Sequence, residues 1–329
     1  KSSDIKGFKS AMQMMQIPMF NTLYADRKGN IYYLYNALLP KRKEGYSWNG
    51  ILPGNRSDLI WESYYDFEDL PQSTNPESGY LQNCNSTPYL ATVGKGNPIR
   101  TLPGNSGIEE FQTNRAYRAN ELYGKDLNIS REEFSNYKYD TYYSDDSVMK
   151  YALNRFLNDV DREDSKLQKG IEILENWDLG NQKENKGAAL AQLTFKLSYN
   201  IKDFKYNYNE ILARFKEAII FLDKEFGQID IPLGKLQILK RGELELPLDG
   251  APDVLRAIYT KEFNNRKVGT AGDCFFQIIE WDQEGNVSAE SIHQYGSATL
   301  NEKSVHYSDQ SHLFSNMDMK PSFINLDSI

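Results

Sequence analysis

The sequence lacks most of the features that mark metal, nucleic-acid and membrane proteins. Its 329 residues include two cysteines, Cys84 and Cys274, and no C-x-x-C or Cys/His cluster, so no zinc site is predicted. It has no apolar run of about 18 residues, the length a membrane-spanning helix needs. Its net charge of −8 provides no basic stripe for a nucleic acid or an anionic membrane surface. We therefore expect no nucleic-acid partner and no membrane span.

Several catalytic and targeting motifs are also missing. The chain has no P-loop, dinucleotide-binding fingerprint, EF-hand, H-E-x-x-H or G-x-S-x-G motif, each of which would place a known chemistry on a known local structure. It begins Lys1-Ser2-Ser3-Asp4, without an initiator Met or the apolar segment of a signal peptide. We therefore expect this chain to be excised from a longer polypeptide. The two cysteines form either one disulfide of an exported protein or, as the sequence favours, two separate buried thiols.

The residues that are present predict an α+β fold. Hydrophobic residues make up 40% of the chain and aromatic residues 13%, enough for a substantial core at this length. A β-rich segment covers residues 17–108, a helical one residues 109–226, and a second β-rich one residues 227–329. Because the helical block lies between β segments, we predict one α+β unit with an inserted helical excursion.

Periodicity places individual elements within these segments. Apolar residues recur at helical spacing in residues 4–16, 151–160, 167–177, 188–197 and 211–226. Two β-rich runs, Thr22 to Asp26 and Ile31 to Tyr35, flank a polar loop with glycine and predict a hairpin whose second strand is covered on both faces. Residues 274–281 and 287–294 predict a second hairpin.

The first hairpin also carries a resemblance. Its pattern N-x-x-Y-A-D-x-x-G-N-I, from Asn21 to Ile31, resembles the penicillin amidase family of N-terminal-nucleophile hydrolases. Five later blocks follow in the family's order: PKR from Pro40, WNGILPG from Trp48, NPESGYLQNCNSTP from Asn75, LPLDGAPDVLRAI from Leu246 and IHQYGSATLNEKSVHYSDQ from Ile292. The nearest branch is that of the acyl-homoserine-lactone and aculeacin A acylases, and the chain resembles the C-terminal part of their catalytic β chain.

The resemblance implies a four-layer αββα sandwich and an exported, periplasmic or extracellular acylase. Family members cleave an amide with an N-terminal Ser, exposed by self-cleavage, whose own α-amine is the base. No Ser-Asn-x-Trp, the family's nucleophile motif, occurs here. We therefore expect the nucleophile and most of the acyl pocket on a missing N-terminal part, and this chain alone to be inactive. No cofactor is expected, and any structural calcium would lie elsewhere in the full protein.

The resemblance gives two residues of this chain a role. Asn21 matches the Asn whose side-chain amide donates to the oxyanion, a task that suits a neutral donor fixed before charge develops. Without the resemblance, Asn21 would be interpreted as a turn residue. Arg42 matches an Arg that orients the Asn and lowers the pKa of the base. A solvated surface run, Lys41-Arg42-Lys43, is the competing interpretation of Arg42.

Two other functions compete with the acylase. A Ser-His-Asp site would draw on one of the three histidines, with Ser304 and with Asp309 or Asp318, but we expect these histidines to be structural. A non-catalytic exported module could bind carbohydrate through its many tyrosines and tryptophans, and a catalytically dead relative would also keep the fold. A small acyl-amide substrate, such as a penicillin, an acyl-homoserine lactone or a lipopeptide, is expected only for the acylase.

Overall fold

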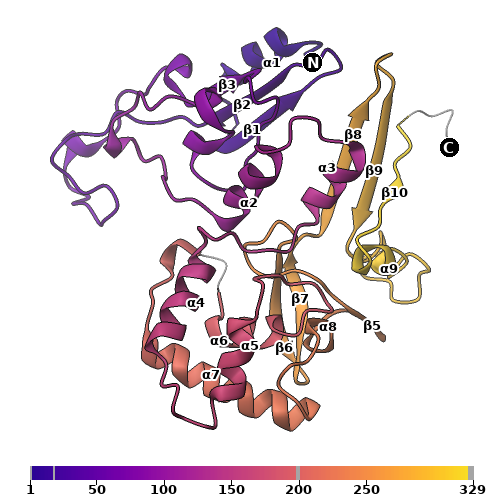
Figure 1. The fold of residues 1–329 in the computed structure, drawn as a ribbon. Coiled ribbons are helices and arrows are strands. Elements are labelled where there is room, and N and C mark those ends of the chain that lie inside the picture. The colour runs from indigo at the N-terminus through magenta and orange to yellow at the C-terminus, as the bar shows by residue number, and fades with distance from the viewer. Residues whose placement is uncertain (1, 18, 198–200, 325–329) are drawn as a thin grey trace. The chain divides into compact units, whose positions relative to one another are not determined.

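The structure is a computed structural model that describes residues 2–17, 19–197 and 201–324. The chain separates into two compact units, residues 1–129 and 130–329 (Figure 1). The boundary falls inside the segment predicted to be helical, so helix α2 belongs to the first unit and helices α3 to α7 to the second. The single unit with segments 17–108, 109–226 and 227–329 stays a prediction.

The first unit is built on the predicted hairpin. Strand β1 (Phe20–Ala25) pairs antiparallel with β2 (Ile31–Asn36), and β2 pairs on its other side with β3 (Gln72–Thr74). In this sheet β1 has a neighbour on one side only, because the strand order is β1-β2-β3. Helix α1 (Ile5–Met12) packs its apolar face against the same core.

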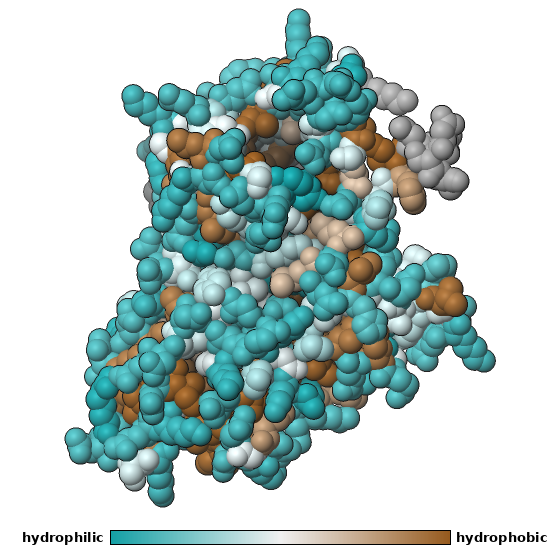
Figure 2. Space-filling model, turned by 45° about the vertical axis from the view of Figure 1, so that its right-hand side comes forward, coloured by the Kyte–Doolittle hydropathy of each residue, from teal (hydrophilic) through white to brown (hydrophobic). Residues whose placement is uncertain are grey.

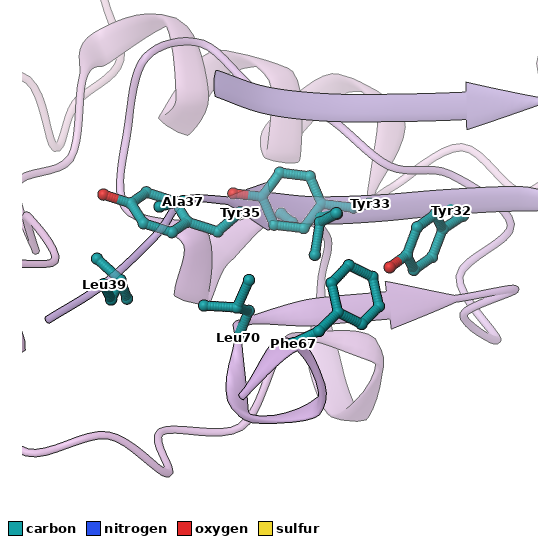
Figure 3. Close-up of a cluster of buried hydrophobic side chains, with 9 residues drawn as sticks. Tyr32, Tyr33, Tyr35, Ala37, Leu39, Phe67 and Leu70 are labelled. Atoms are coloured by element: carbon teal, nitrogen blue, oxygen red, sulfur yellow. The ribbon is translucent and has the colours of Figure 1, made fainter. Parts of the chain in front are cut away.

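Strand β2 is the centre of that core. Tyr32, Tyr33 and Leu34 are completely buried, which confirms that this strand is covered on both faces. Phe67 and Leu70, from the segment before β3, pack against it. Figure 3 shows the rings of Tyr33 and Tyr35 side by side along β2, with both hydroxyls pointing the same way along the strand. A tyrosine in such a core needs a partner for its hydroxyl, and these partners position the site described below.

The rest of the first unit is ordered but irregular. Between Ala37 and Thr113 the chain forms one short strand, β3, and five short 3₁₀ helices. Helix α2 (Asn114–Tyr123) follows, and the Thr113 hydroxyl accepts a hydrogen bond from the Ala116 backbone at its start. This part of the predicted β-rich segment thus contains little regular strand.

The second unit contains most of the helices. They are α3 (Arg131–Lys138), α4 (Val148–Asp159), α5 (Gln168–Glu175), α6 (Ala188–Phe195), α7 (Tyr208–Phe226), α8 (Leu233–Leu236) and α9 (Ser311–Ser315). The completely buried Phe156 of α4 joins this group through ring contacts with Phe195 and Phe215. The apolar stripes expected near residues 151–160, 167–177, 188–197 and 211–226 are therefore core-forming helices.

Two sheets complete the second unit. One has the order β5-β4-β7-β6 and consists of β4 (Gln237–Arg241), β5 (Leu244–Pro247), β6 (Ile258–Phe263) and β7 (Arg266–Gly272). The other contains the second predicted hairpin, β8 (Phe275–Trp281) with β9 (Val287–His293), extended by β10 (Lys320–Pro321). Mixed helices and sheets of this kind confirm the α+β class.

Arg256 lies in the interior of the second unit. Its side chain is completely buried, donates to the Phe314 carbonyl at 2.6 Å and lies 3.5 Å from the Asp273 carboxylate. The guanidinium also stacks 4.0 Å from the Phe314 ring centre. Because a buried charge is costly unless it is paired and hydrogen-bonded, these contacts make Arg256 a cross-link of this unit.

The surface of the described chain adds two observations. No helix in it is both long and apolar enough to cross a bilayer, and on the face drawn in Figure 2 the hydrophobic residues form separate patches within a largely hydrophilic surface. Both cysteines are thiols, Cys84 half-buried and Cys274 exposed. Cys274 is therefore not the buried thiol that we expected, and Cys84 is buried only in part.

Candidate active site

The turn of the first hairpin is held by one carboxylate. Asp26 accepts from the backbone N–H groups of Lys28 and Asn30, and also from the Tyr24 hydroxyl and the Asn30 amide. Desolvation pushes the pKa of Asp26 up, but these hydrogen bonds outweigh it and lower the pKa to about 2. Asp26 is thus structural, as its position at a strand end predicts. It fixes the register in which β1 meets β2.

That register determines the position of Asn21. Asn21 lies directly opposite Tyr35 in the antiparallel pair, so their side chains share one face of the sheet. Tyr33 is two residues from Tyr35 and lies on the same face. The Tyr33 hydroxyl donates to Asn21 Oδ1 at 2.6 Å. The acceptor end of the Asn21 amide is therefore occupied.

The other end of the Asn21 amide is available. Within the described residues, no hydrogen bond from Asn21 Nδ2 to another protein group is found, and the side chain is half-buried. A side-chain amide nitrogen carries two N–H donors. A neutral donor that is held by its oxygen and presents its nitrogen has the character of an oxyanion-hole group.

Tyr35 links Asn21 to the second candidate, Arg42. Burial raises the pKa of Tyr35, and the nearby Glu109 and Tyr89 raise it further, whereas the Arg42 cation opposes the rise. Arg42 thus lies within electrostatic reach of the residue that pairs with Asn21. The structure brings both candidate residues to the neighbourhood of Tyr35.

Arg42 itself is not part of a solvated surface run. It is half-buried, and its Nη1 donates to the Asn105 carbonyl at 3.3 Å. Its Nε is buried and has no hydrogen-bond partner among the described residues. Lys41 and Lys43, its neighbours, are exposed. This difference separates Arg42 from the surrounding cations and favours a specific role.

The alternative Ser-His-Asp site is not assembled. His306 Nδ1 lies 2.8 Å from Asp309 Oδ2, but the Ser304 hydroxyl accepts the backbone N–H of His306. A Ser nucleophile would instead have to face the free ring nitrogen of the histidine. The three residues form a local, exposed loop contact, so the expectation that His306 is structural fits this geometry.

Among the described residues, no large cavity is lined by Asn21 and no metal-binding group is found. Cavities of about 460, 480 and 500 Å³ are found in the second unit, lined mainly by residues of α5 to α8, β6 and β7 and their loops, and none is lined by Asn21 or Arg42. In residues 2–17, 19–197 and 201–324, no three His, Cys, Asp or Glu side chains gather into a metal-binding group. That the enzyme needs no cofactor stays a prediction.

Sequence reasoning missed two residues of this site. Tyr33 was predicted only as a buried strand residue, although its position two residues before the cross-strand partner of Asn21 puts both on one face. Gly107 was not considered, yet its backbone lies against the Arg42 guanidinium, where a methyl group would come within 2.7 Å of the guanidinium carbon. Neither contact has a sequence signal, because each depends on the distance between remote segments.

Comparison with known proteins identifies the family. The family model described as penicillin amidase matches residues 1–329. Penicillin G acylase of Escherichia coli is 37% identical over 68 residues, a stretch that covers 21% of this chain and 8% of that protein. The structure of a thermostable penicillin G acylase from Alcaligenes faecalis, in an orthorhombic form, matches with a TM-score of 0.61 at 16% identity and covers 100% of this chain and 68% of that chain.

The structural match confirms the fold expected of an N-terminal-nucleophile hydrolase. The family model extends over the whole chain, and it includes the hairpin on which Asn21, Tyr33 and Tyr35 come together. The chain belongs to the penicillin amidase family.

Proposed function

We propose that this chain is part of an acylase that hydrolyses the amide bond of an acylated small molecule, and that Asn21 supplies an oxyanion-hole donor. The observation that carries the proposal is the Asn21 side chain, whose oxygen is bound by Tyr33 while its nitrogen has no partner in the described chain. Such a donor stabilises the negative charge that develops on the carbonyl oxygen during attack. Membership of the penicillin amidase family supports the reaction class.

The other parts of the machinery are also proposals. The nucleophile would be an N-terminal Ser, exposed by autoproteolytic processing, on a part of the protein outside this chain, and its α-amine would be the base. With an ordinary pKa of about 7.7–8.0, such an amine suits catalysis near neutral pH. Arg42 would act as a fixed cation that orients Asn21 and lowers the pKa of the amine. The enzyme would be exported, periplasmic or extracellular.

The substrate is proposed only as a class. An acyl chain would enter an apolar pocket formed mostly by the rest of the protein, since the cavities of about 460 to 500 Å³ are not lined by Asn21. Penicillins, acyl-homoserine lactones and lipopeptides share the required acyl-amide bond. The assignment to the acyl-homoserine-lactone and aculeacin A acylase branch is part of this proposal.

The experiment starts from the full-length gene product. Intact mass and N-terminal sequencing of the purified protein should find two chains, the larger beginning with Ser. The processed protein is then tested with 4-nitroanilides of phenylacetic, hexanoic and decanoic acid. Asn21→Ala should lower kcat by about 10²–10³-fold, whereas Thr22→Ala, at the next position of the same strand, should leave it unchanged.

Other outcomes would contradict the proposal. A single unprocessed chain without turnover would indicate a binding module or a catalytically dead relative. Full turnover by Asn21→Ala would show that Asn21 is only a structural residue of strand β1. Turnover by residues 1–329 expressed alone would show that the nucleophile lies within this chain.

A further inference from the structure

The Asn21–Tyr33 contact continues into a third segment of the first unit. Asn83, within the block NPESGYLQNCNSTP, lies near enough to the Tyr33 hydroxyl for its side-chain amide to lower the pKa of that phenol. A hydrogen bond lowers a phenol's pKa when it is donated to the phenol oxygen. Asn83 is thus placed to donate its amide N–H to Tyr33, and Tyr33 donates its own O–H to Asn21 at 2.6 Å.

The far end of this chain of hydrogen bonds is fixed by the backbone. The N–H of Asn85 donates to Asn83 Oδ1 at 3.1 Å, which leaves the amide nitrogen of Asn83 for Tyr33. All the bonds then run in one direction, from the Asn85 backbone through Asn83 and Tyr33 to Asn21. The final donor in the series is Asn21 Nδ2.

We propose that Asn83 and Tyr33 are positioning residues that orient and polarise the Asn21 amide as an oxyanion donor. This inference rests on the proposed function, because it deepens the role given there to Asn21. Aligned hydrogen bonds polarise one another, and each donated bond makes the next group a better donor. The block around Asn83, which the catalytic roles leave unexplained, thereby gains a function.

We call the series of hydrogen bonds from Asn83 through Tyr33 to Asn21 the relay. Burial of Tyr33 keeps its direction fixed. Tyr33 is completely buried, and desolvation, followed by the neighbouring Tyr35, raises the pKa of its phenol well above the ordinary value. The phenol therefore stays protonated at any pH at which an acylase would work. Its single O–H remains available to Asn21, and rotation away from Asn21 would leave the oxygen of this half-buried side chain without its partner.

The direction of the relay gives it a sharp test. Asn83→Asp keeps the acceptor for the Asn85 backbone but replaces the donor to Tyr33 by a second acceptor. The Tyr33 O–H would then turn towards this carboxylate, because hydrogen bonds to charged groups are the stronger ones. Asn21 would lose its partner even though Tyr33 is unchanged.

The decisive measurement is a double-mutant cycle in the full-length, processed enzyme with the same 4-nitroanilides. Tyr33→Phe should lower kcat about 10-fold with little change in KM, the effect of one lost hydrogen bond. In an Asn21→Ala background the same substitution should change kcat less than about 2-fold, since coupled residues are not additive. Asn83→Asp should match Tyr33→Phe, and a protein with both changes should lose no more than either alone.

Tyr32→Phe is the matched control. Tyr32 is also completely buried in β2, but its hydroxyl donates to Gln72, on the opposite face from Tyr33. Tyr32→Phe should lower the melting temperature as Tyr33→Phe does, but it should leave kcat unchanged. Equal losses of kcat from Tyr33→Phe in both backgrounds, or no loss in either, would overturn the relay while Asn21→Ala still tests the proposed function. If Asn21→Ala is inactive and Tyr33→Phe is fully active, the proposed function stands and only the positioning role of Tyr33 fails.

Discussion

The guanidinium of Arg42 packs directly against the backbone of Gly107. A methyl group at Gly107 would approach the two terminal nitrogens of Arg42 to 2.5 and 2.6 Å. Gly107 also has a φ of 92°, which a residue with a side chain adopts at a cost. The position of Arg42 therefore depends on the absence of a side chain 65 residues further along the chain.

Gly107→Ala should displace Arg42 and lower kcat/KM. Gly79→Ala is the matched control, because Gly79 has a φ of 74° but no atom within 4 Å of the added methyl group. Both variants should lose about 1 kcal/mol of stability from backbone strain. Only Gly107→Ala should lose activity, as measured by steady-state kinetics beside thermal unfolding, and equal kinetics in the two variants would contradict the role of Arg42.

Arg42→Met should change the pH dependence of the enzyme. A cation near the nucleophile's amine disfavours its protonated form and lowers its pKa. Removing that cation should raise the pKa, so the acidic limb of the kcat/KM profile should move to higher pH. Lys43→Met, at an exposed neighbour paired with Asp58 on the surface, should leave the profile in place, and identical profiles for both variants would refute the prediction.

Asp26→Asn should weaken the first unit in a pH-dependent way. The pKa of Asp26 is lowered to about 2, below the ordinary value of about 3.9 in an unfolded chain. The ionised carboxylate thus contributes stability that is complete above about pH 4 and is lost as the pH falls towards 2. Urea unfolding at pH 6 should show the variant to be less stable than the wild type, and at pH 2 the difference should vanish. A constant difference would exclude linkage to Asp26.

Arg256→Met should strongly destabilise the second unit. The substitution removes a buried cation from the Phe314 carbonyl and from the Asp273 carboxylate, which keeps Lys138 at 2.7 Å. A buried acceptor left unpaired costs about 1–3 kcal/mol. Arg155→Met removes a largely exposed cation near Asp159 and should cost at most about 1 kcal/mol. Denaturant unfolding followed by tryptophan fluorescence measures both. Similar stabilities would show that Arg256 is not a cross-link.

Local patterns were sufficient to predict the two hairpins. For β1 and β2, the polar loop with Gly29 and the apolar run from Ile31 marked both strands and the turn. For β8 and β9, the loop from Asp282 to Asn286 did the same, with Asp282 again accepting from the turn's backbone. The 19-residue helix α7 was evident from its apolar stripe because its period persists for five turns.

The four-stranded sheet could not be predicted in the same way. Its strands β6 and β7 carry several charged and small residues, so alternation is weak. Strand β4 pairs in parallel with β7. Parallel strands are joined by a long connection, which has no short turn motif to predict it. Only the apolar run from Leu236 to Leu239 gave a local signal for this sheet.

The residues of the candidate site also differ in whether a local sequence pattern predicts them. Asn21 and Arg42 were found by motif, since they lie within or just after the hairpin pattern that resembles the family. Tyr33, Asn83 and Gly107 act on them through contacts that span 12 to 65 residues. Such contacts are set by register and packing, which a single sequence does not contain.

The pairing of Asn21 with Tyr35 has a consequence for how this hairpin can change in evolution. Side chains alternate along a strand, so deleting one residue between Asn21 and the Asp26 turn would move the amide to the opposite face, towards the side of Tyr32 and Leu34. Substitutions at the exposed Leu23 or Ala25 keep this spacing and should be tolerated. The interval between Asn21 and Asp26 is therefore constrained in length, even at positions such as Leu23 and Ala25 where the side chain itself is not.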